Sequence, residues 1–463
     1  MFEKSVYIKR REALMSKISD GILIFIGNTE SPMNYPSNTY HFRQDSTFSY
    51  FTGLEIPNFA LIIDIDNKTT TLYGDDFEID DIIWMGPQPS VSDLASKCGI
   101  TSTAPYSAFE LMVKAANESN QKVHYLPPYR AETKIQLSSL LNISVNDLKS
   151  NASLDLIKAV VALREIKSAI EIEEIEKSCN TGYKMQTTAM KMCKAGVYER
   201  EIAGAIEGIA IGEGSGVSFP IILSQHGETL HNHDHSQKLE NDKLLLVDCG
   251  AENSKNYCSD YTRTIPVSGK FSPIQKQIYE IVLKANTDAI KAIKPDVKFI
   301  DIHLLACRII ADGLKEVGIM KGDMEKAVKD GAHTLFMPHG LGHMLGMDVH
   351  DMENLGENYV GYDDKTTRST EFGTAYVRLG KELKPGFVLT VEPGIYFIPT
   401  LIDIWKNEGK HTEYINYDLL ETFKTFGGIR IEDDVLVTEN SYRVLGKPVP
   451  KTVAEIEDLM NKK

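Results

Sequence analysis

The chain has 463 residues, which is enough for two or three domains with a well-buried core. Its formal net charge of −15 at pH 7 argues against nucleic acid or an anionic membrane as the main partner. It holds no run of about 18 apolar residues and opens on a charged segment, so we expect a cytoplasmic protein without a membrane span or signal peptide. Its six cysteines form no C-x-x-C pair and are predicted to be reduced thiols.

The first third of the chain alternates predicted helices with predicted strands. Helices are predicted at 1–20, 92–98 and 107–117, and strands at 21–27, 47–52, 59–64 and 69–73. This alternation is typical of an α/β domain, which we expect to end near residue 150. Within it, Trp84 lies in DDIIWMGPQP, a polar segment with prolines that predicts a loop. A tryptophan exposed there either plugs a hydrophobic gap or contributes to a ligand surface.

A long, charge-rich helical stretch over 153–194 comes next and fits a connector between two domains. Beyond it, the spacing of apolar residues predicts helices at 199–211, 276–293 and 300–317. No internal repeat of solenoid period is visible along the chain.

The segment 338–351, PHGLGHMLGMDVHD, holds three histidines among closely spaced glycines: His339, His343 and His350. Pro338 and the glycine density argue against a regular helix. They predict a loop whose backbone approaches another group closely. Exposed imidazoles in such a loop suit metal binding or proton transfer.

Four acids stand in or just after apolar runs that predict strands: Asp248, Asp260, Glu392 and Glu432. Asp248 ends one run and Asp260 follows twelve residues later, so adjacent strands could present both acids to one pocket. Glu392 ends the run 387–391, and Glu432 lies in an alternating segment, 429–437, that predicts a single strand. One acid at a strand end is usually a cap or a surface group. Four of them, with a histidine loop between the second and third, favour a metal cluster.

The charge of this set favours two divalent cations. Four carboxylates and one neutral imidazole bring a charge of about −4, which two such cations would offset. Without metal, the carboxylates would repel one another and raise each other's pKa values. Oxygen-rich ligands with one imidazole favour Mn²⁺, with Co²⁺, Zn²⁺ or Fe²⁺ as alternatives. Two ions about 3.5–4 Å apart can share a hydroxide that attacks an amide carbonyl.

The sequence resembles the metal-dependent Xaa-Pro peptidases, the aminopeptidase P and prolidase group with the pita-bread fold. The matching motifs cover nearly the whole chain in order: HFRQDSTFSYFTG, VDCGAE, SDYTRT, PHGLGHMLGMDVHD, LKPGFVLTVEPGIYF and GGIRIEDDVLVT. The resemblance implies an α+β architecture. A creatinase-like α/β domain is expected over 1–152, a connecting helix over 153–178, and a pita-bread catalytic domain, with a curved sheet and outer helices, over 179–463.

The resemblance also implies a ligand set for two divalent metal ions. Asp260 and Glu432 are expected to bridge the ions. Asp248 is expected to chelate one ion, while His343 and Glu392 hold the other. Glu392 is further expected to carry a proton from the attacking hydroxide to the departing proline nitrogen.

By the same resemblance, His339 and His350 are expected to contact the substrate or the tetrahedral intermediate. Arg430 resembles the arginine beside the bridging glutamate, and Thr262 resembles a hydroxyl that supports the ligands. His231 is selected from LHNHDHS because it follows a leucine seventeen residues before the first metal aspartate, and it is expected to stabilise the oxyanion. The other two histidines of that run have no counterpart and are expected to be bystanders.

The implied substrates are proline-containing peptides, whose Xaa-Pro bond has no N–H and carries a fixed ring. Trp84, in WMGP, resembles the tryptophan that packs against substrate, in its own or a partner subunit's site. We therefore expect a homodimer or a dimer of dimers. Arg378, fourteen residues before Glu392, matches the arginine with which eukaryotic-type prolidases read a dipeptide's carboxylate, and its other interpretation is a surface salt bridge.

The resemblance implies an Xaa-Pro aminopeptidase that releases the N-terminal residue from peptides with proline second, by attack of a metal-bridging hydroxide. The alternative is an Xaa-Pro dipeptidase. Methionine aminopeptidase would leave the N-terminal domain unexplained, and creatinase-type enzymes lack the complete metal set. A non-catalytic binding scaffold would be expected to have lost ligands, whereas all five are present.

Overall fold

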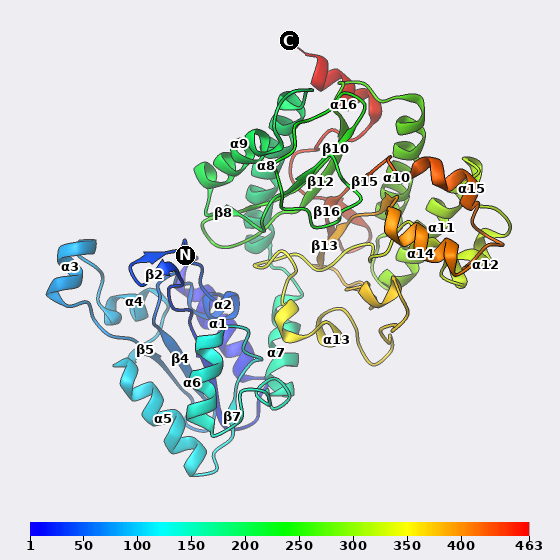
Figure 1. Ribbon diagram of the computed structural model, residues 1–463. Coiled ribbons are helices and arrows are strands. Elements are labelled where there is room, and N and C mark those ends of the chain that lie inside the picture. Colours follow the sequence, from blue (N-terminus) through cyan, green and yellow to red (C-terminus); the bar gives the residue numbers. More distant parts are fainter. Residues whose placement is uncertain (463) are drawn as a thin grey trace. The chain divides into compact units, whose positions relative to one another are not determined.

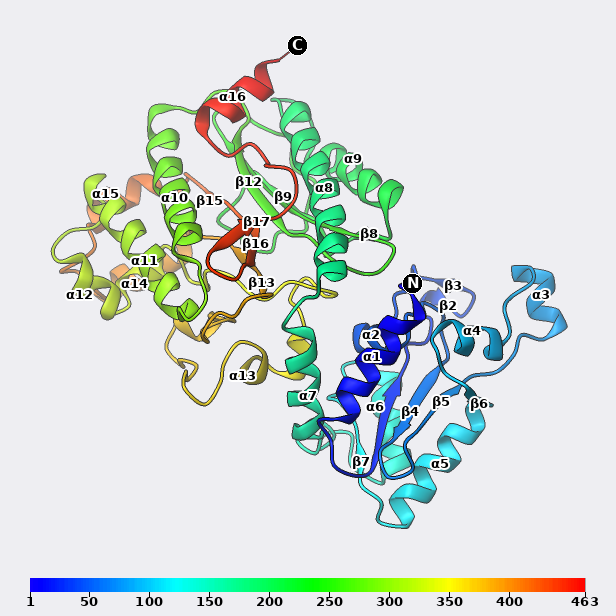
Figure 2. The same cartoon turned by 180° about the vertical axis from the view of Figure 1, so that it is seen from behind.

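The computed structural model describes residues 1–462, and the chain divides into two compact units. The N-terminal unit comprises Met1–Arg164 together with the short segment Met352–Tyr359, and the C-terminal unit comprises Glu165–Asp351 and Val360–Lys463. Figures 1 and 2 show Met1–Arg164 in blue to cyan, Met352–Tyr359 in yellow, and the second unit mainly in green to red. Among the described helices, none is both long enough and apolar enough to cross a membrane.

The N-terminal unit is built on a five-stranded sheet with the strand order β6-β5-β4-β1-β7. The strands of the whole unit are β1 (Ile22–Ile26), β2 (Pro32–Tyr35), β3 (Asn38–Thr39), β4 (Ala60–Asp64), β5 (Thr69–Tyr73), β6 (Ser102–Ala104) and β7 (Val123–His124). Strands β2 and β3 form a separate pair. Its helices are α1 (Lys4–Met15), α2 (Ser46–Thr52), α3 (Ile79–Met85), α4 (Val91–Lys97), α5 (Tyr106–Glu118), α6 (Ala131–Leu141) and α7 (Leu154–Arg164). Strands β1, β4 and β5 run antiparallel, while β6 and β7 join the edges in parallel.

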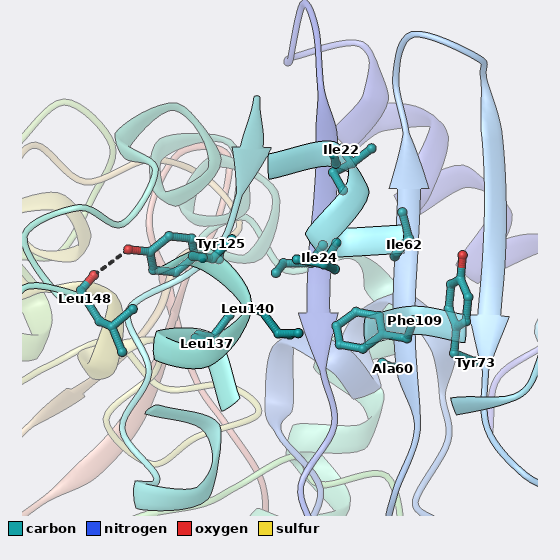
Figure 3. Close-up of a cluster of buried hydrophobic side chains, with 13 residues drawn as sticks. Ile22, Ile24, Ala60, Ile62, Tyr73, Phe109, Tyr125, Leu137, Leu140 and Leu148 are labelled. Carbon is teal, nitrogen blue, oxygen red and sulfur yellow. Dashed lines mark hydrogen bonds between the residues drawn. The ribbon is translucent and has the colours of Figure 1, made fainter. Parts of the chain in front are cut away.

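One core cluster of this unit lies between one face of the sheet and helices α5 and α6. Figure 3 shows Phe109 of α5 and Leu140 of α6 packed with Ile24 of β1 and Ile62 of β4. The two isoleucines share a face because they stand directly opposite each other where β1 pairs with β4. Burial of each such side chain contributes about 1.5–3 kcal/mol.

Residues 47–52 form helix α2, so the prediction of a strand there is wrong. The Oδ1 atom of Asp45 accepts a hydrogen bond of 2.8 Å from the Phe48 amide and caps the helix start. Gly53, with φ of 71°, ends the helix in the left-handed conformation. The segment is rich in threonine and aromatic residues, whose strand propensity is overridden because every residue of the helix is buried.

Two further segments differ from the sequence predictions. Trp84 lies on the short helix α3 rather than in a loop, and it is 87% exposed. The stretch 153–194 is divided into α7 and α8 (Ala169–Met192), with a break at 165–168. Ser168 begins α8 through a capping box with Glu171, in which its amide donates a 3.0 Å hydrogen bond to the Glu171 carboxylate. The division between the two units falls in this break.

The C-terminal unit places helices outside a set of antiparallel strands. After α8, its helices are α9 (Glu199–Glu213), α10 (Pro273–Ala292), α11 (Phe299–Glu316), α12 (Met324–Lys329), α14 (Pro399–Asn407), α15 (Tyr417–Leu420) and α16 (Val453–Asn461). Its strands are β8 (Gly216–Val217), β9 (Ile222–Ser224), β10 (Leu244–Cys249), β11 (Ala251–Glu252), β12 (Tyr261–Pro266), β13 (Val388–Val391), β14 (Gly394–Tyr396), β15 (Gly428–Arg430), β16 (Asp433–Val437) and β17 (Tyr442–Val444).

The strands form two three-stranded sheets, β12-β10-β9 and β13-β16-β17, and two pairs, β11-β8 and β14-β15. In chain order, the helix pair α8–α9 precedes β8–β12, and the helix pair α10–α11 precedes β13–β17. In both views the helices α8 and α9 flank the strands on one side, and α10 and α11 flank them on the other (Figures 1 and 2). Short elements complete the chain: α13 (Glu357–Val360), η1 (Ala332–Leu335), η2 (Glu353–Leu355), η3 (Thr374–Tyr376) and η4 (Glu421–Phe423).

The segment 429–437, predicted as one strand, is divided between β15 and β16. Strand β15 pairs with β14, and β16 pairs with β13, so the chain changes partner at Ile431 and Glu432. At this point the Glu432 amide donates a 3.0 Å hydrogen bond to the Thr262 carbonyl. The break thus brings Glu432 beside strand β12.

Candidate metal centre

The strands deliver the four predicted acids to one region of the C-terminal unit. Asp248 lies in β10 and pairs in register with Thr262 of β12, so that Asp260, just before β12, lies near it. Glu392 directly follows β13, and Glu432 lies in the break before β16. The acids therefore come from strand ends and irregularities, where a side chain can leave the regular sheet.

The histidine loop 338–351 lies along strand β13. The Thr390 amide donates to the His343 carbonyl at 3.0 Å, and the Glu392 amide donates to the Leu341 carbonyl at 2.8 Å. A Cβ atom at Gly342 would lie 1.9 Å from the Thr390 carbonyl oxygen, so only glycine allows this approach. The close backbone approach predicted from the glycines is present, and it places His343 beside Glu392.

One cavity of about 410 Å³ gathers ten of the eleven predicted site residues. These ten are Asp248, Asp260, His343, Glu392, Glu432, His231, His339, His350, Arg378 and Arg430. The eleventh, Trp84, belongs to the N-terminal unit. The cavity is also lined by His233, which the sequence interpretation treated as a bystander, and by Phe219, Ile222, Leu230 and Tyr376.

The predicted ligand atoms face one another across short distances. The Nε2 atom of His343 lies 3.5 Å from the Oδ2 atom of Asp260 and 3.8 Å from the Oε1 atom of Glu392. One ligand atom each from Asp260, His343 and Glu432 lie within 4.8 Å of one another. The other ring nitrogen of His343 contacts the Met344 carbonyl at 3.0 Å, which leaves Nε2 directed at the acids.

The electrostatics of these acids fit divalent cations. Burial, followed by the charges of Glu432 and Asp248, raises the pKa of Asp260 well above its usual value. Burial and the charges of Glu392 and Asp248 likewise raise the pKa of Glu432. Among residues 1–462, no hydrogen-bond donor reaches the buried Oδ1 atoms of Asp248 and Asp260. Orphaned, mutually repelling carboxylate oxygens are the donor set that a pair of divalent cations satisfies.

Arg430 ties the ligands together. Its Nη2 atom donates to Asp248 Oδ2 at 2.5 Å, and its Nε atom donates to Thr262 Oγ1 at 3.1 Å. The Thr262 hydroxyl in turn donates to Glu432 Oε2 at 2.7 Å. Through these bonds one guanidinium orients two of the predicted ligands.

Tyr396 of β14 is a member of the site that the sequence interpretation did not single out. Its hydroxyl accepts a 2.8 Å hydrogen bond from Arg430 Nη1 and lies 2.9 Å from His339 Nε2. The Nδ1 atom of His339 lies 2.8 Å from the Gly340 carbonyl, so Nδ1 carries the proton and Nε2 accepts from the tyrosine. Burial and the Arg430 charge lower the pKa of His339 to about 3, which keeps its ring neutral.

The signal that identifies Tyr396 is its place in the sheet. Gly394 pairs with Arg430, and Tyr396 pairs with Gly428, two residues before that arginine. The tyrosine stands four residues after Glu392 in the motif VEPGIYF, but only the pairing of β14 with β15 reveals its contact with Arg430.

The remaining histidines surround the ligand set. The rings of His350 and His343 meet edge to face, with centroids 4.2 Å apart. Burial and then the charge of Arg430 lower the pKa of His231. His233 contacts the Ile221 carbonyl through Nδ1 at 3.3 Å. These imidazoles offer several hydrogen-bonding groups at the edge of the acidic cluster.

Two family models match the chain. The model described as metallopeptidase family M24 matches residues 173–439, and the model described as the aminopeptidase P N-terminal domain matches residues 7–125. Every predicted metal ligand lies inside the first match. Trp84 lies inside the second.

The chain is also similar to curated proteins and to solved structures over almost its full length. A probable Xaa-Pro aminopeptidase of Fusarium vanettenii is 34% identical over 426 residues, 91% of this chain and 88% of the relative. One from Botryotinia fuckeliana is 31% identical over 458 residues, 98% and 94% of the two chains. Aminopeptidase PepP of Pseudomonas aeruginosa has a TM-score of 0.81 at 27% identity, covering 99% and 98%. Zinc-substituted E. coli aminopeptidase P in complex with product has a TM-score of 0.80 at 26% identity, with the same coverage.

Proposed function

The chain belongs to metallopeptidase family M24, and from this premise we propose that it is a metal-dependent Xaa-Pro aminopeptidase. It releases the N-terminal residue from peptides that carry proline in the second position. One observation carries the proposal: four acids and a histidine converge in a single cavity, next to several further histidines. Relatives named Xaa-Pro aminopeptidase are similar to this chain over 91% and 98% of its length, which supports the proposal.

In this proposal Asp248, Asp260, His343, Glu392 and Glu432 would hold the two divalent cations. When bound, two divalent cations polarise the peptide carbonyl and supply a nucleophile at neutral pH. We favour Mn²⁺ because four carboxylates and one imidazole form a mainly hard donor set, with Co²⁺ or Zn²⁺ as alternatives. Metal analysis of the purified chain, followed by reloading after chelation, tests the number and identity of the ions.

Glu392 is suited to move a proton because its two oxygens point in different directions. Oε1 lies 3.8 Å from His343, on the ligand side, and Oε2 lies 3.9 Å from Nδ1 of His339, on the catalytic side. Its carboxylate takes the proton of the attacking water and returns it to the departing proline nitrogen. That nitrogen needs a proton because a tertiary amide leaves as a secondary amine.

The histidines bind and orient the substrate in this mechanism. His231 and His350 flank the ligand set and donate hydrogen bonds to the oxygen on which negative charge develops. His339 stays neutral because burial and the Arg430 charge lower its pKa, so it can contact a peptide without adding charge. The apolar residues Phe219 and Leu230 offer a wall against which a pyrrolidine ring can pack.

Peptide length is the point on which two candidate functions differ. Arg378 lines the cavity and is close enough for its charge to lower the pKa of Glu392, partly offsetting the rise caused by burial. An arginine there could read the carboxylate of an Xaa-Pro dipeptide, which keeps the dipeptidase as the second candidate. The names of the relatives favour the aminopeptidase.

Ala-Pro and Ala-Pro-Ala, assayed side by side in Mn²⁺ buffer, decide between the candidates. Efficient cleavage of the tripeptide is expected, and cleavage of the dipeptide alone would overturn the aminopeptidase assignment. The variant Arg378→Ala sharpens the assay. If Arg378 reads the proline carboxylate, kcat/KM falls for Ala-Pro and stays unchanged for Ala-Pro-Ala.

We extend the proposal to Trp84 and to assembly in the cytoplasm as a homodimer or dimer of dimers. The N-terminal region 1–152 would carry substrate-packing and assembly surfaces, linked through 153–178 to the catalytic region 179–463. Trp84 shares α3 with Ile79 and Ile83, which are 70% and 69% exposed, and such an apolar surface suits a partner. Trp84→Ala should raise KM for proline peptides, with Ile79→Ala as the matched control. Sedimentation of both variants separates loss of assembly from loss of substrate contact.

A further inference from the structure

A second cluster of potential ligands lies in the C-terminal unit, outside the carboxylate cavity. His303 and Cys307 stand one turn apart on α11, and His333 stands on η1. All three side chains are buried, with exposures of 1%, 0% and 1%. One ligand atom from each lies within 4.8 Å of the other two. The i, i+4 spacing on a helix and a residue from a separate turn form a common way of building a metal site.

His333 is the residue of this cluster that is hardest to explain by packing. Within residues 1–462, neither of its ring nitrogens has a hydrogen-bond partner. The Val328 carbonyl is near enough to oppose, in part, the fall in pKa caused by burial, but it does not reach hydrogen-bonding geometry. A buried imidazole with two unsatisfied nitrogens is costly, whereas an apolar side chain of similar size would be neutral or favourable there.

The spacing of the other two residues fits coordination by one ion. Cys307 Sγ lies 3.5 Å from His303 Nε2. With metal–nitrogen bonds of about 2.0–2.1 Å and a metal–sulfur bond of about 2.3 Å, a tetrahedral ion separates two such ligand atoms by about 3.5 Å. Because Sγ also lies 3.9 Å from Nδ1 of the same ring, the His303 imidazole must turn to direct Nε2 at a shared ion. His333 would then close on that ion as the third ligand.

We propose that His303, Cys307 and His333 bind one thiophilic d¹⁰ cation, Zn²⁺ or Cu⁺, through two imidazoles and one thiolate. Binding forms two metal–nitrogen bonds and one metal–sulfur bond, and the proton of the Cys307 thiol passes to solvent. The imidazoles need lose no proton, because neutral rings already carry the lone pair that a metal requires. The site is independent of the peptidase proposal, since it shares no ligand with the carboxylate centre.

The two cations make different demands on the site. Cu⁺ with one thiolate is neutral overall and is satisfied by three ligands, one soft thiolate and two imidazoles, which suits a buried site. Zn²⁺ with the same ligands keeps one positive charge and needs a fourth ligand such as water. Both ions would tie α11 to η1. The His333 carbonyl accepts hydrogen bonds from Phe336 and Met337, immediately before Pro338 and His339, so the ion would anchor the start of the histidine loop.

The test uses the full chain after chelation, with Mn²⁺ added first to fill the oxygen-rich centre. One arm then adds Co²⁺ as a spectroscopic probe of the Zn²⁺ site, and a second adds Cu⁺ under reducing, anaerobic conditions. We expect one further metal equivalent per chain and, in the cobalt arm, a thiolate-to-metal charge-transfer band. Only a cysteine ligand produces that band, and the proposed peptidase centre contains no sulfur. A chain that takes up no further ion in either arm would overturn the proposal.

Three variants assign the site. Cys307→Ser and His333→Leu should lose the further equivalent and the band, while Cys193→Ser, which removes a different buried thiol, should keep both. Persistence of the band in Cys307→Ser would assign it to another cysteine and refute the site.

Thermal unfolding gives a readout that does not depend on spectroscopy. Zn²⁺ or Cu⁺, added to the manganese-loaded protein, should raise the Tm of the unaltered chain and leave that of His333→Leu unchanged. In the chelated state, His333→Leu should melt at or above the unaltered Tm, because it removes two orphaned nitrogens. An equal metal-dependent rise in both proteins would show that the ion binds elsewhere.

Discussion

Glu432 and Asp433 are neighbours in the chain and both are buried, but the pKa of Glu432 is raised whereas that of Asp433 is lowered. Glu432 faces Asp260 and other acids, and its pKa is raised by burial and by their charges. Asp433 points to the other side of the segment, where its oxygens accept hydrogen bonds from Arg263 at 2.6 Å and Lys451 at 2.7 Å. Burial opposes ionisation there too, but those two cations prevail and lower the pKa of Asp433 to about 2.

The difference separates two uses of a buried acid. Asp433 is compensated by the protein itself and therefore stabilises the fold, joining β12 to the C-terminal segment. Glu432 is left short of positive charge by the protein, so that a cation must complete its surroundings. Because side chains alternate along an extended chain, one residue of displacement is enough to move an acid from one use to the other.

The largest effect is expected from Glu432→Gln, which keeps the size of the side chain and removes its charge. Loss of a bridging ligand should remove metal and lower kcat/KM by about 10³-fold or more, since the ions supply several kcal/mol to the reaction. Near pH 7, the metal-free variant should be more stable than the metal-free unaltered chain. An acid whose pKa is raised on folding costs stability as the pH rises above its unfolded value, and glutamine removes that cost. Metal content, peptide hydrolysis and Tm in chelator measure all three outcomes.

Asp433→Asn should have the opposite effects: it should lower stability and leave metal binding intact. It leaves Arg263 buried without its ionised partner, which is expected to cost about 3–5 kcal/mol of unfolding free energy while the metal content is retained. Chemical denaturation in the metal-loaded state measures this cost. Because the pKa of Asp433 is lowered on folding, the difference between variant and unaltered chain should be fully present above pH ~4. It should shrink as the pH falls towards 2. An Asp433→Asn chain that loses its metals while keeping its stability would contradict the assignment of Asp433 to the fold and Glu432 to metal binding.

His350→Ala should lower kcat by about 10²–10³-fold if its imidazole donates to the developing oxyanion. Both metal ions should remain bound, because the ring contacts His343 edge to face and is not itself expected to be a ligand. Metal analysis beside a kinetic assay separates the two roles. Loss of both ions in this variant would contradict the assignment and would move His350 to the metal-binding set.

Tyr396→Phe should give the smallest effect of the series. It removes the hydroxyl that Arg430 and His339 share, worth about 0.5–1.5 kcal/mol, so kcat is expected to fall by about 3–10-fold. Rescue is expected to be absent with excess Mn²⁺, since no ligand is lost. A variant whose activity returns on adding metal would show that the tyrosine acts on Asp248 through Arg430 instead.

The candidate site could be anticipated from sequence to the extent that its residues lie in contiguous motifs. Asp248, His343 and Glu392 each stand at a recognisable place, at the end of an apolar run or within the glycine-rich loop. The family models and the solved relatives confirm the two-part architecture. Both the strand-end acids and the two-part architecture can be recognised from short contiguous segments of the sequence.

What could not be anticipated depends on pairing between distant segments. Tyr396 contacts Arg430 only because β14 pairs with β15, and Glu432 leaves the regular strand only because its segment changes partner. The residues of helix α2 favour a strand by composition, and the caps that define the helix, Asp45 and Gly53, lie outside this run. Asp434 is a further case: its carboxylate accepts a 3.0 Å hydrogen bond from the Asp260 amide, 174 residues away.

Gly342 allows the histidine loop 338–351 and strand β13 to pack backbone against backbone. A Cβ atom at position 342 would lie only 1.9 Å from the Thr390 carbonyl oxygen, so the contact leaves no space for a side chain. The substitution Gly342→Ala would therefore push the loop and the strand apart and move His343 away from Glu392, although neither of those side chains is altered. The distance between the side chains of His343 and Glu392 therefore depends on residue 342 carrying a hydrogen atom where other residues carry a carbon.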